Sequence, residues 1–469
     1  MIQKEFTRLV LFLLSIIGLN IIVGCNSNTE SNFVVVESGI YDDCQTIKSN
    51  KSIKINGQDK GAGTHSVCSN SVVNVYNPVL DKFEDKLIIF SSSFFEKSKI
   101  NDATTLWYNG PTIVKKEGNV YVGYITSKGE VNVTKYSVDN RKRLDTVTLW
   151  HFNVGDDHSS PSLQFNHNGE LVALFSYHST EMYRAIINTE LELSLSNLSV
   201  IDSGYTTYPM MYKLSNETLI SFYRKGFSGD NSKGEYHYIT SSDGGLTWSD
   251  SNPFIKFDSR YITYAIVDYI DDTLYVAYSS LDRNDGMHKS IYISHSNDLG
   301  KTWFSKDGYS DYLTDENSVK VVSGSQIRIH DIGLYNENVA VSYSKYAQEY
   351  DCCSKNNDLY VYLDDNGESY YIAKGLINYY SDGLVFANDR GNVGYYVSHS
   401  DDASSSVINM VEFNDVDNNF NMVGQVSVDE KIMRLNSSNE LGVGSLTWIE
   451  YEFYNSYNDF KTNLTISGM

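Results

Sequence analysis

Three short stretches of the sequence bring together side chains that can transfer protons or bind an anion. They are Asp156-Asp157-His158, Tyr177-His178 and Tyr223-Arg224. Histidine exchanges protons near neutral pH, tyrosine acts as an acid or a base when its pKa is shifted, and arginine pairs with carboxylates. Each residue alone also has an ordinary explanation: His158 can bond a loop carbonyl, His178 can pack at a rim, and Tyr223 is one of 37 tyrosines. Their meaning therefore depends on whether the fold brings them together.

The elements that would position these residues recur along the chain. Each unit begins with an apolar strand, turns at Asn, Asp or Gly, and continues with a second strand that ends in aromatic residues. The units begin at Pro111, Pro161, Pro209, Ala265, Asp331, Asp382 and, more weakly, Met433. A period of about 50 residues with four short strands per unit is typical of a β-propeller. We therefore predict an all-β fold, a seven-bladed propeller over residues 103–469, with a six-bladed sialidase-like propeller as the alternative.

Two copies of a sharper motif lie within these units, at residues 241–248 and 296–303. Both read Ser-x-Asp-x-Gly-x-Thr-Trp, and residues 365–370 form a degenerate third copy. We predict a hairpin turn in which the Asp carboxylate accepts turn amides, Gly takes a positive φ, and Trp packs between neighbouring sheets. The motif resembles the Asp-box of bacterial neuraminidase repeat (BNR) propellers. There it joins the third and fourth strands, opposite the usual ligand rim, so its expected meaning is structural.

A propeller whose first strands are innermost would gather the chemical residues on one rim. The residues just before each first strand share that rim with the loops after each second strand. The predicted rim residues are His158, His178, Tyr208, Tyr223, Arg224, Tyr278 and His330. Loops on one face of a rigid scaffold commonly carry function, so this rim is the predicted ligand site.

A narrower resemblance is carried by Trp107-Tyr-Asn-Gly-Pro111, Gly155-Asp-Asp-His158-Ser-Ser-Pro161, Phe175-Ser-Tyr-His178 and Phe222-Tyr-Arg224, followed by the first Asp-box. Here the chain resembles the BNR-repeat family that includes ulvan-lyase-type polysaccharide lyases. The resemblance implies that His158, His178 and Tyr223 are catalytic at a uronic acid, with Tyr278 as a contact. It also implies an arginine on the strand before the first Asp-box, where this chain has Tyr236-His237-Tyr238 instead.

The reaction implied by the resemblance is β-elimination at a 4-linked hexuronate. The C5 proton becomes acidic only after the carboxylate is neutralised; a base then removes it, and an acid protonates O4 as the bond breaks. Either Tyr223 serves as base and then acid, or His158 is the base. The predicted substrate-binding residues are Tyr208, Arg224, His237, Arg260, Tyr278 and His330. We predict no cofactor and no catalytic metal, and the sequence leaves open a structural calcium or zinc ion.

Two other classes of function fit the same scaffold. A sialidase-type hydrolase uses three arginines, a tyrosine nucleophile assisted by Glu, and an acidic Asp. This chain has only ten arginines and lacks a Phe-Arg-Ile-Pro-like stretch at its start. A non-catalytic glycan-binding or capsule-associated propeller would bind sugars by stacking on tyrosines, without chemistry. The expected partner is a polysaccharide, and a lyase is favoured while enzyme activity stays open.

Charge excludes one class of partner. The chain carries 37 Lys and Arg against 59 Asp and Glu, a net charge of −22. Nucleic-acid binding requires a basic face, so it is not expected. The same charge would repel an acidic polysaccharide, unless the rim is locally cationic or salt screens the repulsion.

The N-terminal residues are typical of an export signal. Lys4 and Arg8 form a basic region before the apolar run 9–23, and Ile22-Val23-Gly24-Cys25 resembles the lipobox of bacterial lipoproteins. We predict that residues 1–24 are removed and that Cys25 is lipidated, which anchors the protein in the outer membrane or at the cell surface. A simple N-terminal anchor helix is the alternative.

Residues 25–102 are polar and are expected to form a tether or a cap. A candidate strand at 87–95 would close the propeller ring. In an exported protein, Cys44 and Cys68 can form a disulfide. The adjacent Cys352 and Cys353 match no zinc spacing.

Overall fold

The computed structural model describes most of the chain from residue 97 onward and short strands before it. The described residues are 35–37, 44–49, 53–55, 58–60, 63–68, 72–77, 82–88, 97–138, 142–226, 234–258, 260–346, 357–376, 383–387, 390–399, 405–428, 430–437 and 446–467. The predicted leader, Cys25, and the Cys352-Cys353 pair lie outside them. Within these ranges no helix has the length and apolar character needed to cross a membrane.

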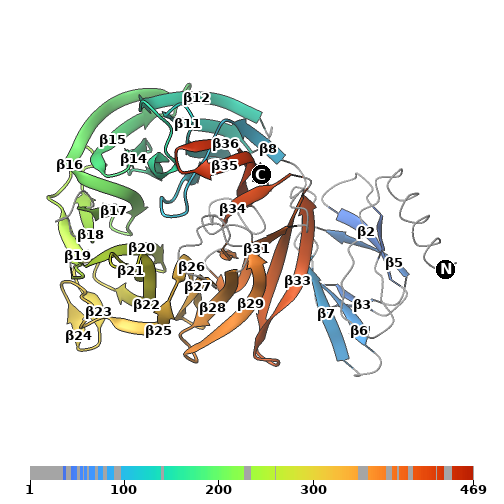
Figure 1. Cartoon of the computed structure of the whole chain (residues 1–469). Coiled ribbons are helices and arrows are strands. Elements are labelled where there is room, and N and C mark those ends of the chain that lie inside the picture. The colour runs from blue at the N-terminus through green and yellow to red at the C-terminus, as the bar shows by residue number, and fades with distance from the viewer. Residues whose placement is uncertain are drawn as a thin grey trace.

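The strands from β8 onward pair into four-stranded antiparallel units, here called blades, which follow one another around a ring (Figure 1). Blade 1 consists of β9 (Ile113–Lys116), β10 (Asn119–Ile125), β11 (Glu130–Ser137) and β12 (Lys142–His151). Blades 2 and 3 consist of β13 (Ser162–Phe165), β14 (Leu171–Ser176), β15 (Thr180–Asn188), β16 (Ser194–Lys213), β17 (Leu219–Lys225), β18 (Glu235–Ser241) and β19 (Asn252–Ile255). They share β16, whose first part pairs with β15 and whose second part pairs with β17.

The remaining blades repeat this order. Blade 4 consists of β20 (Tyr261–Ile270), β21 (Thr273–Asp282), β22 (Met287–Ser296) and β25 (Val319–Ser325), with the hairpin β23 (Trp303–Ser305) and β24 (Gly308–Ser310) inserted. Blade 5 consists of β26 (Ile327–Tyr335), β27 (Asn338–Tyr346), β28 (Asn357–Leu363) and β29 (Glu368–Leu376). Blade 6 consists of β30 (Val385–Ala387), β31 (Arg390–His399), β32 (Ser406–Asn414) and β33 (Asn419–Val428). Blade 7 consists of β34 (Ile432–Ser437), β35 (Leu446–Ser456), β36 (Asp459–Ser467) and β8 (Lys97–Asn101).

This arrangement confirms the predicted all-β propeller and explains its apolar runs. In β14 every residue from Leu171 to Ser176 is buried, because the sheet of each blade is covered on both faces by its neighbours. The Asp-box turns behave as predicted. The Asp243 carboxylate accepts the Thr247 amide at 2.9 Å, and Gly245 has a φ of +91°. The motif tryptophan Trp303 is fully buried and stacks on Phe254 of blade 3 at 4.7 Å.

The ring is closed by strands from the two ends of the propeller. β8 pairs with β36, with Lys97 opposite Ser467 and Asn101 opposite Asn463. Ile100 of β8 is buried in the same cluster as Leu464 and Ile466. The closing strand therefore begins at Lys97 rather than within the predicted 87–95, because Ile100 is the residue that packs against the last strand.

The strands before β8 form two small sheets. One contains β1 (Val35–Glu37), β2 (Cys44–Ser49) and β5 (Gly63–Cys68); the other contains β3 (Ile53–Ile55), β4 (Gln58–Lys60), β6 (Val72–Asn77) and β7 (Lys82–Ile88). These strands lie beside the ring, where β7 contacts β33 of blade 6 (Figure 1). Cys44 lies opposite Cys68 in the β2–β5 pairing, a register consistent with the predicted disulfide, which stays a prediction.

Candidate active site

The turn before β13 holds the first histidine between two carboxylates. Asp156 caps the short 3-10 turn η2 (Asp157–Ser159), and its carboxylate accepts the His158 amide at 2.9 Å. The His158 Nδ1 lies 2.6 Å from Asp156 Oδ1 and 2.9 Å from Asp157 Oδ1. Burial alone would lower the pKa of His158, but the charge of Asp157 and the hydrogen bonds to both carboxylates outweigh it and raise the pKa to about 9. His158 is therefore an imidazolium at neutral pH.

The second histidine lies against the first. His178 follows β14, and its ring stacks on that of His158 with 4.0 Å between centroids and 10° between planes. Its Nδ1 is 3.7 Å from Asp156 Oδ2. Burial, the charge of His158 and the charge of Arg224 lower the pKa of His178 to about 3. The pair thus combines one protonated and one neutral imidazole.

An aromatic residue of blade 7 borders this pair. Tyr457 lies in the β35–β36 hairpin turn, and its carbonyl accepts the Asp157 amide at 3.0 Å. Its ring stands edge-on to His158 at 5.3 Å and to His178 at 5.5 Å. The side chain is 43% exposed, so it forms a wall of the site that solvent can reach.

Two buried arginines and two tyrosines lie next to His158, and we call these four residues the hub cluster. They are Tyr208 on β16, Arg224 on β17, Tyr264 on β20 and Arg328 on β26. The Tyr208 ring is 5.3 Å from His158. The Arg224 guanidinium lies 4.6 Å from the centre of the Tyr208 ring and 4.9 Å from that of Tyr264, and Arg328 lies 6.0 Å from Tyr264. Blades 3, 4 and 5 each contribute to this cluster.

The backbone of Tyr208 shows that its position is imposed by the fold. Its φ is +63°, a region that a bulky residue rarely adopts, at the point where the β16–β17 register shifts. Such a conformation persists only when the surroundings enforce it, and it is concentrated at functional sites.

The arginines separate the acidities of the two tyrosines. Burial alone would raise the pKa of Tyr264, but the charges of Arg224 and Arg328 outweigh it and lower that pKa below its ordinary value. Burial and the neighbouring Tyr264 hold the pKa of Tyr208 well above its ordinary value. A pair of like groups with opposite shifts is a common arrangement for an acid and a base. Tyr264 is the half-buried member and therefore the one that a ligand can reach.

A third arginine links the η2 turn to blade 7. The Arg434 Nη2 donates to Asp157 Oδ2 at 2.6 Å and to the Tyr454 hydroxyl at 2.7 Å, and Nη1 donates to the Thr105 carbonyl at 2.9 Å. Arg434 and Asp157 are both almost fully buried. This ion pair fixes the carboxylate that in turn holds His158.

The site is cationic although the chain is acidic. Arg224, Arg328, Arg434 and protonated His158 together face two carboxylates, those of Asp156 and Asp157. The net charge of −22 therefore does not describe this rim. An anionic ligand would meet a local surplus of positive charge there.

The structure brings together four of the predicted rim residues, namely His158, His178, Tyr208 and Arg224. His330 is adjacent to them. Its ring lies 5.8 Å from Trp107, which also contacts Arg328, and its Nε2 lies 2.7 Å from the Ser344 hydroxyl. Burial and the charge of Arg328 lower the pKa of His330 to about 3, so it is a neutral support of the cluster.

Tyr223 and Tyr278 are placed differently from the sequence-based prediction. Both are fully buried. The Tyr223 hydroxyl donates to Asp202 at 2.6 Å, and burial and that carboxylate hold the pKa of Tyr223 well above its ordinary value, which opposes a role as base. Tyr278 lies within β21, not at its end, and donates to Ser318 at 2.6 Å. It packs against Phe257 and Tyr292 and is therefore a core residue.

Two of the predicted substrate-binding residues, Arg260 and His237, are already paired with carboxylates. Arg260 is half-exposed and donates to both oxygens of Asp282, with Nε to Oδ1 at 2.9 Å. The His237 Nε2 lies 3.4 Å from Glu235, and its ring lies opposite Tyr223 across the β17–β18 pairing. Arg224 occupies the hub cluster instead, because side chains alternate along β17 and its own side faces Tyr208 and Tyr264.

Four site residues were missed from the sequence: Tyr264, Arg328, Arg434 and Tyr457. The first three stand within three residues of predicted unit starts, at Ala265, Asp331 and Met433. The rule that located His158 and Tyr208, which takes the residues just before a unit start, would have found Tyr264 and Arg328 if it had been applied to every unit; Arg434 follows its unit start and escapes the rule. Tyr457 lies in a hairpin turn between the second and third strands of blade 7, and no local pattern marks it.

Asp156, His158 and His178 also offer three potential metal ligands within 4.8 Å of one another. A histidine ligand must be a neutral imidazole and binds the ion in the plane of its ring. Nearly parallel rings 4.0 Å apart do not direct two such lone pairs to one point, and the carboxylates favour a proton on His158. The cluster is therefore better suited to holding a proton than a metal.

Comparison with solved structures gives the fold a context. The fold is similar to that of an ulvan lyase, which is described as a new family of polysaccharide lyase, PL25, bound to -[GlcA(1-4)Rha3S]-. The TM-score is 0.61 at 13% sequence identity, and the match covers 80% of this chain and 96% of that one. A second structure, also described as a PL25 ulvan lyase of a new family of polysaccharide lyase, has a TM-score of 0.59 at 13% identity, with the same coverage of both chains. Polysaccharide lyase Uly1 has a TM-score of 0.55 at 12% identity, covering 79% and 98% of the two chains. These likenesses show the propeller fold.

Sequence comparison identifies the family. No curated protein matches the chain significantly. Residues 119–375, more than half of the chain, match the family described as "BNR repeat-containing family member". The chain therefore belongs to the BNR repeat-containing family.

Proposed function

We propose that this protein is a polysaccharide lyase that cleaves uronic-acid-containing glycans by β-elimination. The observation that carries the proposal is Tyr264, whose pKa is held low by the buried cations Arg224 and Arg328. Elimination requires a neutralised carboxylate next to a base, and this arrangement provides both within one cluster.

The residues take the following parts in the reaction. The buried guanidinium groups of Arg224 and Arg328 offset the charge of the uronate carboxylate through space and so make the C5 proton acidic. The Tyr264 phenolate removes that proton, a C4–C5 double bond forms, and the C4–O4 bond breaks. The imidazolium of His158 gives its proton to the departing O4, and exchange with solvent then restores both groups. Neutral His178 and Tyr457 shape the site beside His158.

The solved structures support the substrate class. The ulvan lyase whose fold this chain shares is described with a bound oligomer that contains glucuronic acid. The local surplus of positive charge at the rim attracts a carboxylated sugar. It also offsets the repulsion that the net charge of −22 would otherwise cause.

Two other functions have an observation in their favour. Two of the ten arginines, Arg328 and Arg434, lie over the ring of Trp107, and converging arginines are also a feature of a sialidase-type hydrolase. The lyase is preferred because Arg434 is bonded to Asp157, which leaves Tyr264 between the other two cations. The half-buried Trp107 and the exposed Tyr457 beside the cluster suit a glycan-binding propeller without catalysis.

The test compares two conservative tyrosine variants on a panel of uronic-acid polysaccharides. The ultraviolet absorbance of the unsaturated product is followed for wild type, Tyr264→Phe and Tyr223→Phe. We expect Tyr264→Phe to lose a factor of about 10²–10⁴ in rate, as for other general bases, while Tyr223→Phe stays active. Loss of activity in Tyr223→Phe alone would transfer the role of base to Tyr223.

Other outcomes of this assay decide between the classes. New reducing ends without the unsaturated chromophore would show hydrolysis. Saturable binding of the glycan by wild type without any product, across the pH range, would show a glycan-binding protein and overturn the lyase.

We also propose that the mature protein is anchored by lipid at Cys25 in the outer membrane or at the cell surface. The lipobox-like sequence 22–25 behind the apolar run supports this. Cys25→Ser should stop incorporation of labelled fatty acid and prevent release of residues 1–24. Unchanged processing in that variant would contradict the proposal.

A further inference from the structure

A polar cavity lies at the ends of the innermost strands of blades 1–3 that are opposite the active-site rim. Its volume is about 540 Å³. β9, β13 and the second part of β16 all start near the active-site rim and end at this cavity, at Lys116, Phe165 and Lys213. Tyr208 and Lys213 are five residues apart on one strand, which corresponds to about 17 Å. The cavity is therefore separate from the hub cluster.

Hydrogen-bond donors dominate the polar lining. Lys115, Lys116 and Lys213 line the cavity together with Gln164, His167 and Glu217. The Gln164 Oε1 accepts the Phe165 amide at 3.0 Å, which leaves its amide NH₂ as a donor. Three lysines against the single carboxylate of the lining are unusual in a chain with 59 acidic and 37 basic residues. This composition selects for an anion.

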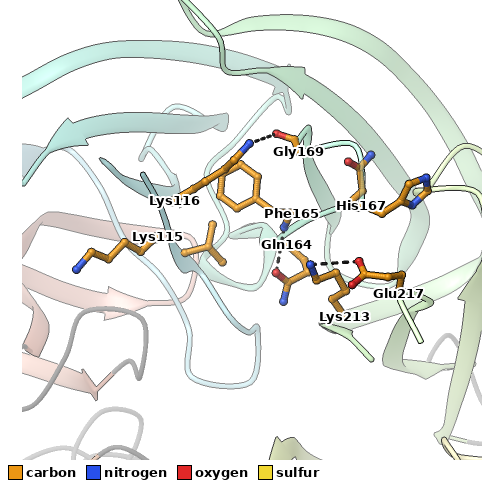
Figure 2. A pocket seen from close by; sticks show the side chains of 10 residues that line it. Lys115, Lys116, Gln164, Phe165, His167, Gly169, Lys213 and Glu217 are labelled. Atoms are coloured by element: carbon orange, nitrogen blue, oxygen red, sulfur yellow. Dashed lines mark hydrogen bonds and ion pairs between the residues drawn. The ribbon is translucent and has the colours of Figure 1, made fainter. Parts of the chain in front are cut away.

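Two of the three lysines, Lys116 and Lys213, are held in place by contacts that leave them spare donors. The Lys116 ammonium donates to the Gly169 carbonyl at 2.9 Å and lies 5.1 Å from the Phe165 ring centre (Figure 2). Lys213 lies 3.4 Å from Glu217 (Figure 2). Each ammonium has three N–H donors, so one such contact does not exhaust it. Lys116 also lies 4.0 Å from the exposed Glu117, a weak pairing.

The cavity also has an apolar part, which limits the class of ligand that would fill it. Val114 and Phe165 belong to the lining, and both are buried core residues. The volume lies in the range of small-molecule sites, about 300–1,000 Å³. Inorganic phosphate would leave most of this space and the apolar surface unused, whereas an acidic sugar has an anionic group, hydroxyls and an apolar ring face.

We infer that this cavity is a second binding site for an acidic saccharide unit, one that bears a carboxylate or a sulfate. Its position at the far end of the innermost strands means that it holds a different part of the polymer, or a different chain, from the active site. The inference does not depend on the chemistry of the hub cluster.

The experiment measures binding of a glucuronic-acid-containing tetrasaccharide by calorimetry at low salt. The mature full-length protein carries Tyr264→Phe throughout, so that the probe is not cleaved. Three proteins are compared: the Tyr264→Phe parent, the cavity variant that adds Lys115→Gln/Lys213→Gln, and a control that adds Lys301→Gln/Lys374→Gln. The control removes the same charge from two exposed lysines that do not line the cavity.

In the cavity variant we expect the affinity of one class of site for the tetrasaccharide to fall by at least about tenfold. This is the effect expected for the loss of one or two charge-assisted hydrogen bonds. The control should bind like its parent. Equal isotherms for the cavity variant and the control would overturn the inference, and so would inorganic phosphate or sulfate binding as tightly as the tetrasaccharide.

A third variant separates this result from the fate of the proposed active site. Arg224→Ala should remove binding at the hub cluster and leave the cavity site unchanged. If the hub cluster binds no sugar, the proposed function fails. The parent should then still bind the tetrasaccharide at the cavity, and the cavity variant should lose that binding.

Discussion

The imidazole rings of His158 and His178 lie parallel, 4.0 Å apart, yet they hold their protons very differently. Carboxylates raise the pKa of His158 to about 9, and burial together with its charged neighbours lowers the pKa of His178 to about 3. One ring is thus kept charged and the other neutral across the physiological range. The arrangement makes pH a direct probe of the site.

The first prediction concerns stability against pH. A histidine whose pKa is raised on folding stabilises the protein fully below its unfolded pKa of about 6.5, and that stabilisation is lost as the pH rises through about 9. The loss should be on the order of 3 kcal/mol in the free energy of unfolding. Urea unfolding between pH 6.5 and 10 measures it, and His158→Gln should remove this slope.

His178 predicts the opposite slope in acid. Its pKa is lowered on folding. In the unfolded chain His178 is protonated below about pH 6.5, whereas in the native state it is protonated only below about pH 3. Stability should therefore fall on acidification over this window, and His178→Gln should flatten the fall. An unchanged acid slope in that variant would show that other groups dominate.

The rate of the proposed reaction should rise and then fall as the pH increases, so the pH–rate profile should have two limbs. The rate rises as Tyr264 loses its proton, at a lower pH than for an ordinary tyrosine, and falls as His158 loses its proton near pH 9. The pH dependence of kcat/KM on a uronic-acid polysaccharide tests this. Arg328→Met removes one of the cations beside Tyr264, so it should move the first limb to higher pH. A limb that does not move would exclude Tyr264 as the base.

The buried pair of Arg434 and Asp157 should be a strong determinant of stability. Arg434→Met leaves the buried Asp157 carboxylate with His158 as its remaining cationic neighbour, so the loss should be at or below the about 3–5 kcal/mol that is typical when one partner of a buried ion pair is removed. Asp157→Asn in the same chain should recover part of this loss. Urea unfolding of the two single variants and the double variant gives the coupling, and strictly additive losses would contradict it.

Tyr457 should affect binding more than chemistry. Its ring borders both histidines and is 43% exposed, so Tyr457→Ala should raise KM by about three- to tenfold with kcat nearly unchanged, as expected for loss of one aromatic contact. Tyr457→Phe should behave like wild type. Tyr309→Ala is the matched control, because Tyr309 is also an exposed tyrosine near a hairpin turn but lies in the β23–β24 insertion.

The sequence by itself determined the architecture and the η2 turn. Strands repeated with a period of about 50 residues and the two Asp-boxes specify local hairpins, and the turn residues Asp243 and Gly245 act as their chemistry requires. The spacing of Asp156 and His158 is equally local, because the carboxylate bonds an amide and a ring only two residues away. Period and turn chemistry act over a few residues, so they can be read along the chain.

Only the tertiary structure decided which tyrosine is a candidate base. Tyr223 and Tyr264 both stand near predicted rim positions, but the first is bonded to Asp202 and the second lies between Arg224 and Arg328. These partners come from other strands, and Arg328 comes from another blade. A pKa depends on the charges that surround a group in space, and the closing of the ring sets those neighbours.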